Sequence, residues 1–253
     1  MQTWRKAPAW LPPVATALGL LVLWQAAIML FDVPAYIAPA PSAMVMEFVH
    51  QYRLILTSLA PTALEAVSGF VCGNLFAVGL AIVLVRSQLA ERCIYPLAVF
   101  VHSIPILAVA PILVLVFGTG YAPKIVIASL ICFFPTLVNM VRGLKSVPPQ
   151  MLEMMRVMYA TDRDILTKVR LQCSLPFLFA ALKVTAPASI IGAIVGEWIG
   201  SSYGLGAMIL EATYNFRAAL LYATVFVCAG LAIVLFALVT LVEQRVMRWA
   251  PLG

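Results

Sequence analysis

The sequence predicts an all-α membrane protein with six transmembrane helices. Three observations carry this prediction: the apolar composition, six long apolar windows, and an uneven distribution of Lys and Arg. Of 253 residues, 64% are hydrophobic and 10% charged, whereas soluble domains are about half apolar and one quarter charged. A chain of this size has too little interior to bury so much apolar surface. The composition therefore excludes a disordered chain, a collagen-like rod and a nucleic-acid-binding domain.

Six apolar windows are long enough to cross a membrane, because a spanning helix needs about 20 residues. They cover approximately residues 10–31, 59–85, 95–117, 122–141, 177–200 and 220–242. Between the first two windows, Ser42 is expected to cap a short amphipathic helix that runs to about Leu56. The whole chain, residues 1–253, is predicted to form a single transmembrane domain.

Lys and Arg fall mainly in alternate loops. With the N-terminus inside, twelve of them lie in cytoplasmic segments: Arg5, Lys6, Arg86, Arg92, Arg142, Lys145, Arg156, Arg163, Lys168, Arg170, Arg245 and Arg248. The opposite side holds three, which are Arg53, Lys124 and Arg217. This bias predicts that both termini are cytoplasmic. The net charge of +6 therefore reflects topology and does not indicate a nucleic-acid partner.

The predicted cytoplasmic loop at about residues 142–172 is long and highly charged. Pro149 begins a short helix, on which Leu152, Met155 and Met158 recur at helical spacing. Thr161 is expected to cap a second helix over about residues 162–171, which Pro176 closes. A methionine-rich apolar face on a charged helix favours docking to a cytoplasmic partner over a fully solvated loop.

The run from Glu153 to Pro176, EMMRVMYATDRDILTKVRLQCSLP, resembles the EAA loop of ATP-binding-cassette (ABC) importer permeases. Glu153 matches the glutamate of that motif, and Met154 and Met155 stand at its two alanine positions. Tyr159 stands where the family has glycine. Because a left-handed conformation is costly for tyrosine, we expect the turn to shift to the next two residues.

Other segments resemble the nitrate, sulfonate and taurine branch of these permeases, and the resemblance covers about residues 10–249. The matching segments are Pro39–Ser42, Pro105–Ile112, Gly118–Ile125, Phe133–Asn139 and Gly204–Gly206. The resemblance implies a type I ABC importer permease fold in the bacterial inner membrane. It also implies a substrate that is either a small organic anion or a nitrogen heterocycle.

The resemblance further implies the partners. They are a second copy of the chain, two cytoplasmic ABC ATPase subunits, a periplasmic or lipid-anchored solute-binding protein, and membrane lipid. ATP and Mg are expected on the ATPase subunits, and no cofactor on this chain. The residues implied in ATPase coupling are Glu153, Met154, Met155, Arg156, Met158, Tyr159, Ala160 and Thr161.

The residues themselves argue against catalysis by this chain. It has no GxxxxGK[ST] motif for ATP phosphates and no carboxylate pair, Ser–His pair or His/Cys cluster at catalytic or metal-binding spacing. We therefore expect a transport subunit rather than an enzyme. The alternative, an ion-gradient-driven carrier, would leave the long charged loop without a role and would need inverted repeats, which are not apparent.

Polar residues inside the windows are candidates for the translocation path. They are His102, Ser103, Pro105, Asn139 and Glu197. His102 either bonds to a neighbouring helix or lines the pore, and Glu197 either lines an external gate or lies at the membrane interface. Asn139 is also expected to bond between helices, as are Glu65 and Asn74.

Two further patterns concern helix packing. Small residues recur four apart at Gly69 and Gly73, and again at Ala188, Gly192 and Gly196, which favours close helix packing. Four prolines in the apolar windows are expected to kink the helices around a path. They are Pro105, Pro111, Pro135 and Pro187.

Overall fold

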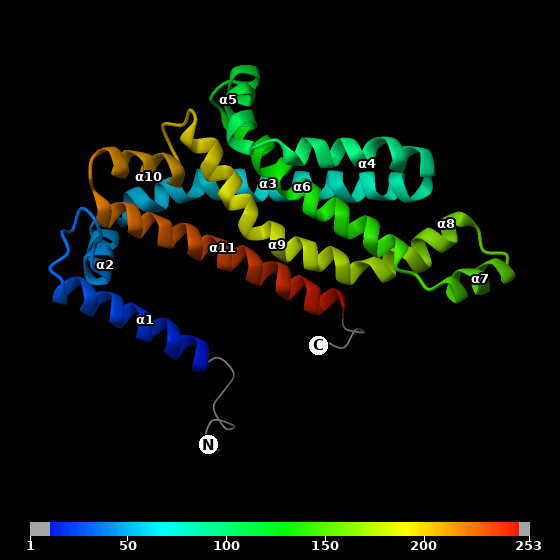
Figure 1. The fold of residues 1–253 in the computed structure, drawn as a ribbon, viewed down its shortest axis with the longest axis horizontal. Helices are drawn as coiled ribbons and strands as arrows, with labels where there is room; N and C mark the ends of the chain where they lie inside the picture. The colour runs from blue at the N-terminus through cyan, green and yellow to red at the C-terminus, as the bar shows by residue number, and fades with distance from the viewer. Residues whose placement is uncertain (1–10, 248–253) are drawn as a thin grey trace, which may run out of the picture. The chain divides into compact units, whose positions relative to one another are not determined.

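The computed structural model describes residues 11–247, which form helices joined by short connections (Figure 1). Arg5, Lys6 and Arg248 of the charge count lie outside these residues, as does the start of the first window. The helices are α1 (Leu11–Leu30), α2 (Pro41–His50), α3 (Tyr52–Arg86), α4 (Gln88–Ser103), α5 (Ile106–Phe117), α6 (Tyr121–Lys145), α7 (Pro149–Val157), α8 (Asp162–Asp164), the π-helix η2 (Ile165–Arg170), α9 (Leu171–Trp198), α10 (Leu205–Tyr214) and α11 (Ala218–Val246). No strand occurs within residues 11–247, which confirms the all-α class.

The chain divides into two compact units, each described by itself. Among the described residues, the first consists of residues 11–57 and Met208–Val227, and the second of Ser58–Ala207 and residues 228–247. In the first, Trp24 of α1 packs against Tyr222 and Phe226, with ring centroids 5.9 and 6.3 Å apart. Those aromatic contacts hold α1 to the start of α11.

The six predicted windows all correspond to helices, but the third is broken. In the described residues, five helices are long and apolar enough to cross a membrane, and α4 with α5 makes a sixth if the bent pair counts as one span. The two helices meet at 96°. Ile104 at the break is extended (φ −75°, ψ 127°), the conformation that a following proline favours. Of the four prolines expected to kink spans, Pro105 lies at this break, whereas the other three lie within helices.

Two predicted helix boundaries are wrong. Ala40, not Ser42, is the N-cap of α2, and Pro41 takes the first helical position. Proline is preorganised there, because its fixed φ suits the helix and its missing N–H has no partner to lose. In addition, α2 ends at His50 rather than near Leu56.

The predicted second loop helix does not stop before Pro176. Helix α8 continues through η2 into α9, so that residues 162–198 form one run that includes this proline. Proline is tolerated inside membrane helices because neighbouring groups satisfy the carbonyl it leaves free. The cap is as predicted, since Thr161 and Asp164 form a capping box.

The core of the second unit is the packing of α6 against α9, with α3 beside α6. A Cβ at Gly192 would lie 2.6 Å from Ala128 Cα, and one at Gly73 would lie 2.4 Å from Ser129 O. The glycine stripes therefore let the backbones of α3 and α9 approach α6, as the sequence predicted.

Candidate functional site

The candidate coupling segment consists of α7 and the turn that follows it. Helix α7 ends in a Schellman motif: Ala160 N–H donates to Met155 O, and Tyr159 N–H to Arg156 O, both at 3.0 Å. This geometry needs a left-handed residue, and Tyr159 supplies it with φ 57°. The expectation that the turn shifts to Ala160 and Thr161 is therefore wrong. The two hydrogen bonds keep the turn at Tyr159, which stands at the position where the family resembled in the sequence analysis has glycine.

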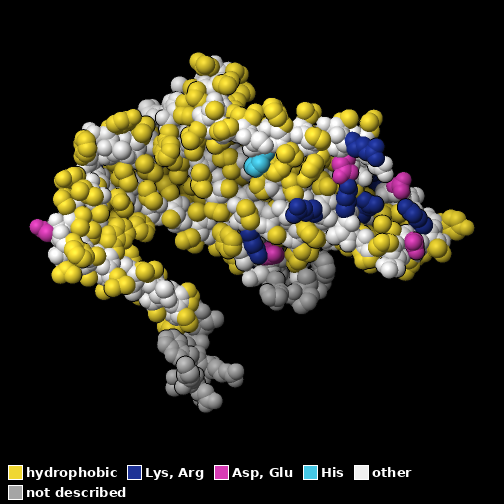
Figure 2. Space-filling model, in the orientation of Figure 1, with side chains coloured by type: hydrophobic (Ala, Val, Ile, Leu, Met, Phe, Trp, Pro, Cys, Tyr) yellow, Lys and Arg dark blue, Asp and Glu magenta, His cyan; other side chains and the backbone are white. Residues whose placement is uncertain are grey.

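The outer surface of α7 is unusually apolar for an exposed helix. Five large apolar side chains are exposed: Met151, Met154, Val157, Met158 and Tyr159, the last at 96%. Glu153 and Arg156 are exposed as well, whereas Leu152 and Met155 are half-buried. Lys and Arg side chains gather over the end of the second unit that carries α7 and α8 (Figure 2). We refer to the five apolar residues as the α7 patch.

A cavity of about 360 Å³ lies on the inner side of this loop. Four charged side chains line it, and none forms an ion pair within the part of the chain that the structure describes. They are Arg86, Arg156, Asp162 and Arg170. The loop therefore carries unpaired charge beside its apolar patch.

Three of the predicted path residues meet at the break in the third span. His102, Ser103 and Pro105 all line one cavity of about 390 Å³ between α4, α5 and α6. The His102 imidazole stacks on the Phe134 ring, with centroids 4.1 Å apart and an interplanar angle of 12°. Non-helical backbone at membrane depth is tolerated where it lines a cavity, and this break meets that condition.

The other two predicted path residues lie elsewhere. Asn139 Nδ2 donates to Pro135 O within its own helix, and among residues 11–247 its side chain does not make the predicted interhelical bond. Glu197 is 1% exposed. Its side chain is therefore buried inside the second unit, and the two alternatives expected for it, an external gate or an interfacial position, stay predictions.

Glu197 caps a helix. Its Oε1 accepts from the Thr62 hydroxyl at 2.6 Å, and its Oε2 accepts from Gly206 N–H at 2.5 Å. The Thr62 oxygen accepts from Leu205 N–H at 2.8 Å. These two N–H groups begin α10 and have no partner within the helix, and a carboxylate is favoured at that positive end. A Cβ at Gly204 (φ +103°) would lie 2.0 Å from Glu197 Oε1, which explains a glycine there.

Glu65 does contact another helix, as predicted, but sequence reasoning missed that its partner is a buried lysine. Lys124 Nζ lies 3.1 Å from Glu65 Oε1, and the side chains are 1% and 0% exposed. Lys124 also donates to Ser201 Oγ at 2.8 Å and lies 3.9 Å from the centre of the Tyr203 ring. The ammonium group is thus surrounded by a carboxylate, a hydroxyl and a π face, which offset the loss of water. The sequence held one signal for this pair: Lys124 and Glu65 each lie inside an apolar window, and the two windows are different.

Asn74 does join helices, as predicted. Its Oδ1 accepts from the hydroxyls of Thr136 at 2.5 Å and Thr185 at 3.3 Å, so α3, α6 and α9 share one buried polar contact. No group of three His, Cys, Asp or Glu that could hold a metal is found among residues 11–247.

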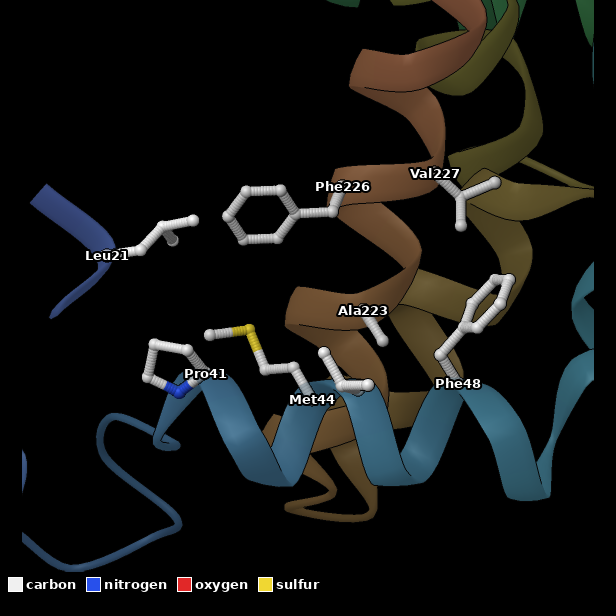
Figure 3. Close-up of a pocket in the computed structure, with 8 residues that line it drawn as sticks. Leu21, Pro41, Met44, Phe48, Ala223, Phe226 and Val227 are labelled. Atoms are coloured by element: carbon white, nitrogen blue, oxygen red, sulfur yellow. The ribbon is translucent and has the colours of Figure 1, made fainter. Parts of the chain in front are cut away.

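The first unit has a cavity of its own, of about 350 Å³ (Figure 3). Its lining is apolar: Leu21, Pro41, Met44, Val45, Phe48, Ala223, Phe226 and Val227. The Phe226 and Met44 side chains point toward the space beside Leu21 (Figure 3). Without a hydrogen-bonding side chain in that lining, the cavity does not suit a polar solute.

Comparisons with known proteins agree on one family. The family described as "binding-protein-dependent transport system inner membrane component" matches residues 73–248. A probable ABC transporter permease protein of Haemophilus influenzae is 33% identical over 89% of this chain and 92% of its own length.

Three of the relatives carry substrate names, among them the putative aliphatic sulfonates transport permease protein SsuC of Bacillus subtilis, which is 26% identical over 97% of this chain and 90% of its own. The formylaminopyrimidine transport permease protein ThiX of Halalkalibacterium halodurans is 31% identical, over 94% of this chain and 96% of its own. The riboflavin transport system permease protein RibX of Chloroflexus aurantiacus is 32% identical, over 92% and 88%. Among solved structures, the methionine ABC transporter MetNI in an inward-facing conformation aligns with a TM-score of 0.59 at 22% identity, over 78% of this chain and 94% of that one. This similarity supports the predicted type I fold.

Proposed function

Since the chain belongs to the family of inner membrane components of binding-protein-dependent ABC importers, we propose that it forms a solute pathway as a homodimer. With the bent pair α4 and α5 counted as one span, the chain has six, which is half of the twelve that the resemblance implies for a complete pathway. The partner copy would supply the other half. This proposal takes the chain as a transport subunit and not as an enzyme.

We propose that α7 docks into a cytoplasmic ATPase subunit, one for each copy. The observation that carries this proposal is the α7 patch, whose exposure in water is unfavourable and whose methionines adapt to an irregular groove. Glu153 and Arg156 add charge beside it. ATP and Mg would sit on the ATPase, so that its closure moves the spans between two arrangements.

The proposed orientation puts both termini and the α7 loop in the cytoplasm. The charge bias of the loops supports it. A solute-binding protein, periplasmic or lipid-anchored, would then deliver cargo to the opposite face. By analogy with the relatives named for formylaminopyrimidine, riboflavin and aliphatic sulfonates, the cargo is a nitrogen heterocycle or a small organic anion.

Docking can be tested by co-purification. We would express the chain with its ATPase and compare wild type with the double variant Met154→Glu, Met158→Glu, which places two carboxylates in the patch. We expect loss of the ATPase from the purified complex. Met46→Glu, at an equally exposed position on α2, is the matched control and should retain it. Retention by the double variant would refute docking through this patch.

A further inference from the structure

The cavity at the broken span has a composition that discriminates between solute classes. Its walls are formed mainly by apolar and aromatic side chains, and its volume of about 390 Å³ is within the range of small-molecule sites. Among the described residues that line it, His102 and Ser103 are polar and none is Lys, Arg, Asp or Glu. A sulfonate or carboxylate entering this cavity would lose water and find no Lys or Arg side chain in the described lining, which is costly.

The polar groups of the cavity are available to a ligand. No side chain or backbone group among residues 11–247 hydrogen-bonds to the His102 imidazole; its face is instead stacked on Phe134. The stack holds the plane of the imidazole while leaving its ring nitrogens free. The Ser103 hydroxyl donates to Val99 O at 2.9 Å, so its oxygen retains lone pairs that can accept.

Apolar and aromatic walls with a few hydrogen-bonding groups suit a planar ligand that is apolar on its faces and polar at its edge. An uncharged nitrogen heterocycle has this form. Phe133 and Phe134 of α6 supply aromatic surface, while His102 and Ser103 of α4 supply a donor or acceptor. An uncharged heterocycle therefore matches the side chains that line the cavity better than an organic anion does.

We propose that the cavity at the α4–α5 break is a binding site for an uncharged planar nitrogen heterocycle, with His102 as the residue that recognises its edge. This inference rests on the proposed importer function and narrows its cargo to one of the two classes that the sequence left open. The proposal also means that this chain itself recognises the solute, in addition to any solute selection by a binding protein.

Binding can be measured on the purified full chain in lipid nanodiscs with three radiolabelled probes: formylaminopyrimidine, riboflavin and an aliphatic sulfonate. We expect saturable binding of at least one heterocycle and none of the sulfonate. His102→Ala should weaken heterocycle binding about tenfold, the loss expected for a hydrogen bond and a stacking surface. His102→Phe keeps a ring without the nitrogens and should lose a similar factor, because the ring nitrogens recognise the edge of the ligand.

The chain offers a matched control in its only other histidine. His50→Ala, in α2 of the first unit, should bind as wild type does. Preference for the sulfonate, or unchanged heterocycle binding by a folded His102→Ala variant, would overturn the proposal. Size-exclusion profiles of the variants establish that they are folded, and Phe134→Leu provides a second substitution in the same stack.

The same variants separate this inference from the importer function. The assay uses proteoliposomes that contain the chain with its ATPase and binding protein. If they take up a sulfonate with ATP, and His102→Ala does not change this uptake, the importer function is supported and the heterocycle site is refuted. If the purified chain binds a heterocycle but no ATP-driven uptake occurs, the heterocycle site is supported and the importer function is refuted.

Discussion

Lys124 and Glu65 show how one pair of side chains joins two spans. Both are fully buried, and each would be strongly disfavoured in the membrane without the other. The pair therefore makes the attachment of α3 to α6 depend on two charges. Removal of one charge should cost far more than removal of both.

Lys124→Met should destabilise the protein by about 3–5 kcal/mol, because it leaves Glu65 buried without its partner. Thermal unfolding in detergent, followed by size exclusion, measures the loss. Lys145→Met is the control: its partner is Glu91, the pair is partly exposed, and such pairs contribute about 0–1 kcal/mol. The double variant Glu65→Leu, Lys124→Met should recover much of the stability. Equal melting temperatures for Lys124→Met and Lys145→Met would contradict this account.

Tyr159 carries a backbone cost that glycine would remove. A left-handed conformation costs a non-glycine residue about 1–2 kcal/mol, and its side chain is 96% exposed, so little contact is lost. Tyr159→Gly should therefore raise the free energy of local opening at the end of α7 by about 1 kcal/mol, and hydrogen exchange there should become slower. Ala160→Gly, the next residue, should speed it. Faster exchange in Tyr159→Gly would show that the tyrosine ring stabilises the turn.

At this scale the sequence predicted local geometry better than distant contacts. The capping box of Thr161 and Asp164 depends on four consecutive residues and was predictable. The Lys124–Glu65 pair depends on how α3 packs on α6, so Lys124 was assigned to an outer loop by the charge count. Tyr159 kept the family's turn because two backbone hydrogen bonds outweigh its preference, a balance that residue type alone does not reveal.

At the scale of elements, small residues determine which helices lie together. The backbones of α3 and α9 both approach α6 at glycines, with α6 in contact with both. The sequence predicted these stripes because spacing by four places residues on one helix face. The sequence did not show which of the four prolines would break a helix. Three of them lie inside helices, where neighbouring groups satisfy the carbonyl that proline leaves free, and only the backbone at Pro105 is not helical.

Gly192→Ala should destabilise the protein, because its Cβ would fall 2.6 Å from the Ala128 backbone and force α6 and α9 apart. We expect a loss of about 1–3 kcal/mol, typical of overpacking. Gly79→Ala and Gly230→Ala are matched controls within membrane helices, since a Cβ at either meets no atom within 4 Å. Their melting temperatures in detergent should equal or exceed that of wild type. A neutral Gly192→Ala would contradict the packing argument.

At the scale of the whole molecule, the chain is an inner membrane component of a binding-protein-dependent transport system. The apolar windows and the loop charges predicted a membrane protein with a cytoplasmic partner, and the comparisons confirm the permease family. A kink at Pro105 was predicted, but the cavity beside it was not, because the sequence could not show which of the four prolines breaks a helix. The substrate class depends on that cavity and was left open by the sequence for this reason.

Glu153→Lys should uncouple transport while leaving the protein in the membrane. The change reverses the charge beside the α7 patch without altering a buried contact, since Glu153 is exposed. We expect ATP-driven uptake to fall at least tenfold, with ATPase activity no longer stimulated by the loaded binding protein. Arg53→Glu, a charge reversal near the start of α3, is the control. Wild-type uptake and ATPase rates in Glu153→Lys would remove the coupling role of α7.

The central claim is that a separate ATPase drives this chain through α7. The most direct measurement is solute uptake into proteoliposomes that contain the purified chain, with and without its ATPase and ATP, under an imposed proton or sodium gradient. We predict uptake against a concentration gradient when the ATPase and ATP are present, and none when an ion gradient is the sole energy source. Uphill uptake by the chain alone, driven by either ion gradient, would contradict the claim and identify a secondary carrier.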